Sequence, residues 1–255
     1  MNISQLSREE IEASLKKNRK ETESSESIRI IFSPRKINSK NLKEVSSVFS
    51  QLGNEDYHTV VVVETHEGEA EKKLPMPSFK FIETPYGNIE TNDQLRNDFA
   101  DEDDDFFIND DAFDEDVSLH DQLIMLQHTL DNFKVLSIQI TDERSFYVKE
   151  LAAAMEEILA SKNVLILFCC DLKSDKIDEL KRVVKIIESD NESELMNYLN
   201  GGTSSVEGVG AFISGLLVAR KWGLRIYFGA LHSDSNHQTN LLTGFADMQK
   251  QAIFK

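Results

Sequence analysis

The segment Val164-Leu-Ile-Leu-Phe168 decides the fold, because every one of its positions is apolar. A strand that is apolar on both faces is typical of the centre of a parallel sheet that helices cover on both sides. Two other segments have the same character, Thr59-Val-Val-Val-Val63 and Val135-Leu-Ser-Ile-Gln-Ile140. The sequence therefore predicts an α/β protein built around buried strands.

Segments with helical periodicity lie before and after these strands in the sequence. A strand at residues 28–32 precedes a helix that we expect Ser39 to cap, and a last helix over residues 210–222 leads to a strand at 224–228. Between them, apolar residues recur every three or four positions: Leu42, Val45, Phe49 and Leu52; Leu151, Met155, Ile158 and Leu159; Ile177, Leu180, Val184 and Ile187. Repeated strand–helix units predict one α/β domain, with a central, mostly parallel sheet and helices on both faces.

Composition limits the classes of function. Among 255 residues, 45 acidic and 28 basic side chains give a formal net charge of −17, a field that repels nucleic acid. The longest uncharged apolar run, residues 208–219, is too short to span a bilayer, and the charged residues 1–27 do not form a signal peptide. The adjacent Cys169 and Cys170 argue against a disulfide scaffold. We therefore expect a cytoplasmic protein with no nucleic-acid and no membrane partner.

Two polar segments interrupt the α/β pattern. Residues 1–27 are expected to be a polar leader, either helical after the capping box of Ser7 and Glu10 or mobile, and residues 28–255 to be the domain. Within the domain lies an acidic loop at residues 101–116, where ten of sixteen side chains are acidic. Such a loop can hold a divalent cation or stay solvated. We favour solvation, because packed like charges repel and the central glycine of an EF-hand is absent.

Six segments carry a family pattern in matching order and spacing. They are Phe32-Ser-Pro34-Arg35, Val63-Glu64-Thr65-His66, Thr84-Pro85-Tyr86-Gly87, residues 116–127, Cys169-Cys170-Asp171-Leu172-Lys173-Ser174 and Thr243-Gly244-Phe245-Ala246. Together they resemble the Memo family, which is protein B of the AmmeMemoRadiSam gene neighbourhood. The resemblance covers most of residues 28–250 and identifies the sequence as a divergent member.

The resemblance implies a fold related to the class III extradiol dioxygenases, which use non-haem iron. In typical members, histidines at the strand ends and a late cysteine or histidine form a metal-capable site in a cleft. By gene neighbourhood alone, the resemblance also implies two companion proteins, an AMMECR-type protein and a radical-SAM enzyme.

The departures from the family pattern fall on the metal ligands. Arg35 replaces the first histidine, whereas His66 retains the second. The remaining positions also differ: Val117 and Ser174 replace histidines, His120 replaces a glutamate, and Ser235, in a loop with His232 and His237, lies near the late cysteine position. A transition metal needs three or four protein ligands, so His66 alone cannot hold one. We therefore favour no metal and no cofactor.

We expect a ligand-binding cleft at the carboxyl edge of the sheet. Its candidate residues are Arg35, His66, Asp171, Ser174, His232, Ser235 and His237. Arg35 either clamps a carboxylate or phosphate or is a surface residue, and His66 either binds the ligand or is a satisfied strand-end histidine. Asp171 either orients a neighbour or, as we favour, caps the helix near Ser174. The two cysteines are expected to be buried packing thiols.

Three functions agree with these residues. We favour a divergent Memo-like protein with a degenerate metal site, which binds a small anion or a protein partner and does not catalyse a reaction. The first alternative is a metal-dependent redox enzyme that holds Fe(II) with a rearranged set such as His66, His232 and His237. The second alternative is a structural, complex-forming protein that docks a basic partner through residues 101–116.

Overall fold

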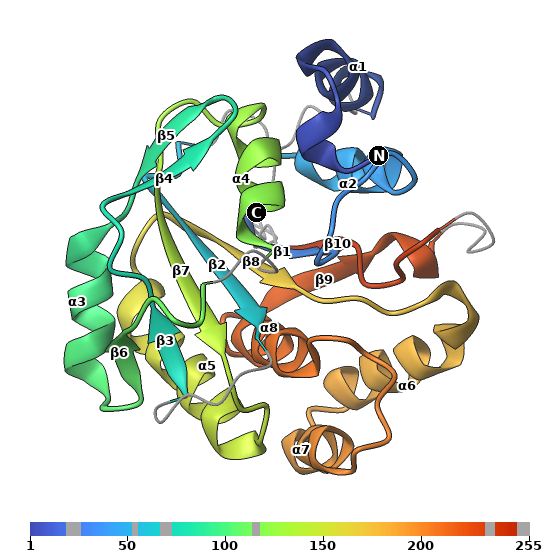
Figure 1. Ribbon diagram of the computed structural model, residues 1–255. Helices are drawn as coiled ribbons and strands as arrows, with labels where there is room; N and C mark the ends of the chain where they lie inside the picture. The colour runs from blue at the N-terminus through green and yellow to red at the C-terminus, as the bar shows by residue number, and fades with distance from the viewer. Residues whose placement is uncertain (19–26, 53–55, 67–72, 114–117, 233–237, 249–255) are drawn as a thin grey trace, which may run out of the picture.

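Four adjacent parallel strands form one side of a six-stranded sheet in the computed structural model (Figure 1). The structure describes residues 1–18, 27–52, 56–66, 73–113, 118–232 and 238–248. The strand order is β7 (Lys134–Ile140), β2 (Thr59–Thr65), β8 (Val164–Cys169), β1 (Ile28–Ser33), β10 (Gly244–Met248) and β9 (Leu224–Phe228). The predicted class, α/β with a mostly parallel sheet and helices on both faces, is confirmed.

At one edge of the sheet, the strand predicted at residues 224–228 is confirmed as β9. β10 was not predicted as a strand, yet it pairs antiparallel with β1 on one side and with β9 on the other. β9 therefore follows β10 at the outer edge and does not pair with any of the four parallel strands. Because β9 lies at this outer edge, the residues that follow it lie far from the end of β2.

The buried strands divide their side chains between two layers of helices. Val61 and Val63 of β2 lie in one core, and Val60 and Val62 lie in the other, as the two-residue period of a strand requires. The first core is covered by α3 (Asp93–Glu102), α5 (Ser145–Leu159), α6 (Ile177–Glu188), α7 (Glu192–Asn200) and α8 (Val209–Lys221). The second is covered by α1 (Arg8–Asn18), α2 (Leu42–Phe49) and α4 (Leu119–Gln127) (Figure 1). Among the described helices, none is long and apolar enough to cross a membrane.

Helix α8 approaches the sheet most closely at Gly215. A Cβ atom at this position would lie 2.6 Å from the ring of Phe32 and 2.7 Å from the ring of Phe168. Two strands therefore contact α8 through aromatic rings where a larger residue would not fit. Close packing of this kind fixes the start of α8 relative to the ends of the strands.

The N-terminal segment packs on the second core. Ser7 and Glu10 form the expected capping box, in which Ser7 N donates to Glu10 Oε2 at 2.8 Å and Glu10 N donates to Ser7 Oγ at 3.2 Å. Behind this box, Ile11 and Leu15 of α1 are buried, as is Ile3 in the short helix η1 (Ile3–Gln5). The described part of the leader therefore contributes apolar side chains to the same core as α2 and α4.

Two local expectations were wrong. Ser39 does not cap α2: Asn41 occupies the N-cap, and its Oδ1 accepts from Asn38 N at 2.8 Å. The acidic segment is also not one loop, because residues 101–102 end α3 and residues 106–108 form β6 (Phe106–Ile108), which pairs in parallel with β3 (Leu74–Met76). Phe106 is buried, so its burial against Phe99 orders this stretch despite the surrounding charge. A hairpin of β4 (Phe81–Thr84) and β5 (Gly87–Glu90) completes the strands.

Candidate functional site

The carboxyl ends of adjacent parallel strands bring three of the predicted residues to one edge of the sheet. Arg35 follows β1, His66 follows β2, and Asp171 follows β8. These three strands are neighbours in the order β2, β8, β1. In open α/β sheets this edge is where ligands bind, so the region is the candidate site.

The turn that carries Arg35 is held by three side chains, one that follows β8 and two from α4. Arg35 N donates to Asp171 Oδ2 at 3.0 Å, and Ile37 N donates to Asp121 Oδ2 at 2.7 Å. Gln122 Nε2 donates to the carbonyl oxygen of Pro34 at 2.8 Å. Because Asp121 and Gln122 lie in the first turn of α4, this helix positions the turn after β1.

The guanidinium of Arg35 reaches across the end of β8 to β2. Its Nη2 donates to the carbonyl oxygen of Thr65 at 3.2 Å. Its Nε is shielded from solvent and has no hydrogen-bond partner among the described residues. A guanidinium has only donors and no free lone pair, so Arg35 cannot replace the metal-ligating histidine that the family pattern has there.

Asp171 orients this turn and does not cap a helix. The cap interpretation favoured from the sequence is wrong, because the carboxylate accepts from Arg35 N and the short helix η2 (Ser174–Lys176) has no side-chain cap. Burial raises the pKa of Asp171 to about 6, although the hydrogen bond from Arg35 and the charge of its guanidinium favour ionisation. Glu207 and Glu44 add negative charge that raises this pKa further.

Glu143 fills the start of α8. Its Oε1 accepts from Gly210 N at 2.6 Å and from Thr65 Oγ1 at 2.9 Å. A carboxylate at a helix N-terminus is favoured by the free amides and the helix dipole. The helix start at Gly210 thus holds a carboxylate of the same chain. Glu143 was missed, although a charged residue soon after a buried strand is a usable signal.

Beneath the edge, Glu64 is a buried carboxylate with only 1% of its surface exposed. One oxygen accepts from Gln139 Nε2 at 2.8 Å, and the other accepts from the backbone N of Ser118, at the start of α4. The sequence interpretation missed this group too. In the sequence, this buried pair is indicated by a polar residue within an otherwise apolar strand, Glu64 in β2 and Gln139 in β7.

Of the predicted histidines, the structure describes His66 and His232, and it does not bring these two together. His66 N continues the β2–β7 ladder by donating to the carbonyl oxygen of Ile140 at 3.1 Å. His232 follows β9; its Nδ1 lies 3.0 Å from the carbonyl oxygen of Phe228, and its ring stacks on Tyr227 at 4.4 Å. β9 is four positions from β2, which at a strand spacing of about 4.8 Å separates the two strands by roughly 19 Å.

The other predicted residues contribute less to this edge. Ser174 is exposed in η2, and Ser235 and His237 lie outside the described residues. Cys169 and Cys170 are fully buried in opposite cores, which confirms them as packing thiols. Burial raises the pKa of both thiols well above the ordinary value.

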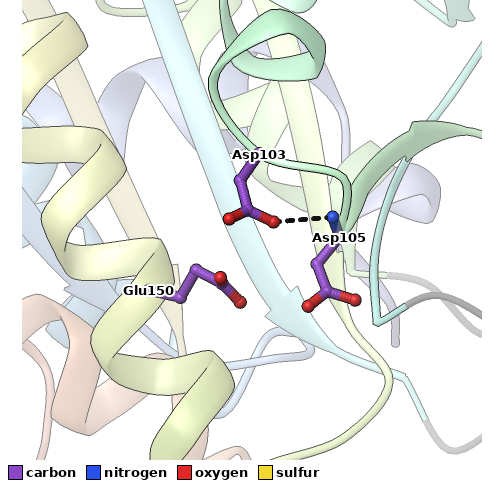
Figure 2. Close-up of side chains that lie close together, drawn as sticks. All are labelled: Asp103, Asp105 and Glu150. Atoms are coloured by element: carbon purple, nitrogen blue, oxygen red, sulfur yellow. Dashed lines mark hydrogen bonds between the residues drawn. The ribbon is translucent and has the colours of Figure 1, made fainter.

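A second group of carboxylates lies between α3 and α5. Asp103 and Asp105, which follow α3, face Glu150 of α5 (Figure 2). Ligand atoms of these three residues lie within 4.8 Å of one another, and among the described residues this is the one such group of at least three histidine, cysteine or acidic side chains. Burial, Asp103 and Asp105 together raise the pKa of Glu150 to about 8.

Comparison with known proteins agrees with the observed fold. The family model described as Memo-like protein matches residues 3–243. The chain belongs to the Memo family. Among solved structures, this Memo-family chain is similar to an uncharacterized protein from Escherichia coli K12, with a TM-score of 0.54 and 9% identity over 86% of this chain and 98% of that one. At this identity the likeness concerns the fold alone, and no curated protein matches the chain.

Proposed function

We propose that this Memo-family protein binds a small anion at the carboxyl edge of its sheet and does not use a metal there. The proposal depends on one observation. The guanidinium of Arg35 lies over the ends of β2 and β8, at the position where the family pattern has its first ligating histidine, and its Nε lacks a partner among the described residues. A cation of the chain itself thus takes the position of a metal ligand.

The residues at this edge do not fit a non-haem iron. Three or four donors with free lone pairs are needed, whereas Arg35 offers none and repels a divalent ion. Asp171 Oδ2 already accepts from Arg35 N, and His66 and His232 follow strands roughly 19 Å apart at a strand spacing of about 4.8 Å. We therefore assign no catalytic step to this site.

A carboxylate or a phosphate suits the side of the guanidinium that carries Nε, because Nε has no partner among the described residues and Nη2 has a second N–H besides the one that bonds Thr65. Nε and Nη2 present two parallel N–H donors, which match two oxygens of a planar or tetrahedral anion. The neighbouring Asp171 opposes an anion when ionised, and with its pKa at about 6 it becomes neutral in mildly acidic solution. Anion binding should therefore strengthen as the pH falls through this range.

Titration with inorganic phosphate and with acetate, followed by protein NMR, tests this proposal at about pH 5.5 and about pH 7.5. We expect saturable shifts around Arg35 and Asp171 that are stronger at the lower pH and absent in Arg35→Gln. The matched control is Arg29→Gln, since Arg29 lies at the other end of β1. Shifts that persist in Arg35→Gln would contradict the assignment.

An anaerobic titration with Fe(II) and Zn(II), with elemental analysis of the purified chain, tests the other half of the proposal. We expect no saturable binding at this edge. One tightly bound iron per chain that is lost in His66→Ala would instead support the rearranged redox enzyme. We also propose a cytoplasmic location and, by analogy with the family's gene neighbourhood alone, AMMECR-type and radical-SAM companion proteins.

A further inference from the structure

His128 ends α4 and lies in an interface between three parts of the chain. Its side chain is only 3% exposed, and its ring packs edge-on against Tyr86, in the turn between β4 and β5, with 4.6 Å between the ring centroids. Its Nδ1 lies 3.8 Å from Glu12 Oε1 of α1. Figure 1 shows α4 between the β4–β5 hairpin and α1. The imidazole therefore contacts both neighbours of this helix end, away from the first turn of α4 that holds the Arg35 turn.

The surroundings of this ring suit a neutral imidazole. Nε2 of His128 is shielded from solvent and has no hydrogen-bond partner within the described residues. In the neutral form Nε2 can carry the lone pair, and the proton on Nδ1 then faces the Glu12 carboxylate. A second proton would create a buried N–H donor at Nε2 without an acceptor, which is more costly than an unused lone pair.

The charges around His128 act on its protonation in both directions. Across the described chain, the titratable and charged groups that face the ring are Glu12 and Arg8 of α1 and the phenol of Tyr86. Burial has the largest effect and lowers the pKa of His128 from its ordinary 6.5, whereas Glu12 raises it and Arg8 lowers it. Arg8 Nε already donates to Glu12 Oε1 at 2.7 Å, so the nearest carboxylate is shared between two groups. The interface therefore disfavours proton uptake by the ring.

Helix α1 is held less firmly than the hairpin on the other side of His128. Ile11 and Leu15 of α1 are buried in the same core as α2 and α4, but among the described residues no hydrogen bond joins residues 8–18 to another helix or strand. The β4–β5 hairpin is joined to α4 directly, since Thr84 Oγ1 donates to Gln127 Oε1 at 2.5 Å. Of the two neighbours, α1 is therefore the one that a charged ring would displace more easily.

We propose that His128 is a pH-sensitive latch, which keeps α1 docked on the domain while its ring is neutral and releases α1 in mildly acidic solution. Once α1 has moved away, water supplies the acceptor for Nε2–H that the interface lacks, so the imidazolium is more stable in the released state. Docking is therefore strongest above about pH 6.5 and weakens as the pH falls below this value. Glu12 limits the release, because its carboxylate partly stabilises the charged ring while α1 is docked.

Hydrogen–deuterium exchange of the full chain at about pH 7.5 and about pH 5.5, corrected for the intrinsic exchange rate at each pH, tests the latch. The opening constant of residues 8–18 should rise at least about threefold at the lower pH, whereas that of α8 should change less than about twofold. In His128→Phe, which keeps a ring that cannot take up a proton, the rise should disappear. The matched control His120→Phe replaces an exposed histidine near the start of α4 and should keep the rise.

A second variant, Glu12→Gln, tests the latch without changing the buried ring, since the Glu12 side chain is 50% exposed. It removes the charge that favours the docked imidazolium, so the ratio of the opening constants at the two pH values should become about twofold larger than in the parent. Circular dichroism of each variant checks that the fold is retained. A rise in His128→Phe equal to that of the parent, a ratio in Glu12→Gln no larger than the parent's, or protection of α1 that does not change with pH would overturn the proposal. Arg35 takes no part in the latch, so each of these results leaves the anion-binding proposal untouched.

Discussion

Two regions of this molecule gather carboxylates, and they stabilise them differently. At the carboxyl edge, Asp171, Glu143, Asp121 and Glu64 each accept a hydrogen bond from a donor of the chain. Between α3 and α5, Asp103, Asp105 and Glu150 face one another (Figure 2). One hydrogen bond joins them to a donor of the chain, from Asp105 N to Asp103 Oδ1 at 2.8 Å.

The two groups differ in how much the chain uses them: the carboxylates at the edge hold turns and helix starts in place, whereas those between α3 and α5 make few such contacts. Backbone N–H groups at turns and helix starts let a buried carboxylate stay charged at modest cost, and each such bond fixes the turn that donates it. Acids that face each other have fewer such donors, and burial together with the neighbouring acids raises the pKa of Glu150 to about 8, above the value of about 6 for Asp171 at the edge. The first arrangement holds the Arg35 turn, whereas the second leaves three acidic side chains facing one another.

We expect the largest change in the free energy of unfolding from replacing Glu64, which is almost fully buried. Glu64→Ala leaves Gln139 Nε2 and the backbone N of Ser118 without their acceptor and opens a cavity. We expect the free energy of unfolding to fall by about 3 to 5 kcal/mol in urea denaturation. Glu64→Gln, which keeps the volume and one acceptor, should lose less. Equal losses would show that Glu64 acts through its charge and not through its hydrogen bonds.

Replacing Asp171 is expected to change the free energy of unfolding in the opposite direction, which means that it stabilises the fold. Its folded pKa of about 6 exceeds the ordinary 3.8, so its contribution to stability is full below 3.8 and declines as the pH rises through 6. Asp171→Asn keeps an acceptor for Arg35 N and removes the buried charge. We expect it to raise the free energy of unfolding at about pH 7.5 by about 1 to 3 kcal/mol, and by less near pH 4.

Urea denaturation at both pH values measures this difference, with the exposed Asp175→Asn as control. A destabilised Asp171→Asn at the higher pH would mean that Arg35 depends on the negative charge and not only on the acceptor atom. The comparison between the two regions would then be weaker, because the edge would also depend on net charge.

The titration of Glu150 should change the free energy of unfolding over a higher pH range than the titration of Asp171 does. Its folded pKa of about 8 is raised from 4.5, so the native state retains a proton that the unfolded chain has released between these values. Stability from this group therefore declines as the pH rises from 4.5 to about 8. Glu150→Gln should remove that decline and raise the melting temperature at about pH 8.5 relative to the parent. A parallel pH profile in parent and variant would show that the three carboxyls do not share a proton.

Hydrophobic periodicity was enough to predict the buried strands. Runs such as residues 164–168 are apolar at every position, which suffices to identify buried parallel strands and hence the edge where Arg35 and Asp171 meet. The antiparallel β10 could not be found in this way, because Gly244-Phe245-Ala246-Asp247 has neither alternation nor an apolar run. Its insertion places β9, and with it His232, far from His66.

The contacts of the site depend on tertiary structure and not on local pattern. Asp171 was expected to cap a helix because short polar residues after strands often do, but a neighbouring turn offers its N–H instead. Glu143 meets Gly210 only because α8 packs tightly on Phe32 and Phe168. The group of carboxylates between α3 and α5 was partly foreseen as a charged segment, whereas its third member, Glu150 of α5, lies more than forty residues further along the chain.

The smallest effect is expected from acidic residues that belong to neither region. Asp104 and Asp111 are exposed and lie in the same acidic segment as Asp103. Asp104→Asn with Asp111→Asn should change the free energy of unfolding by less than about 0.5 kcal/mol, because solvent already screens both charges. The melting temperature in low salt and in about 0.5 M salt measures the change. A clear gain that disappears in salt would mean that like charges repel one another along the whole acidic segment, and not only among the three facing carboxyls.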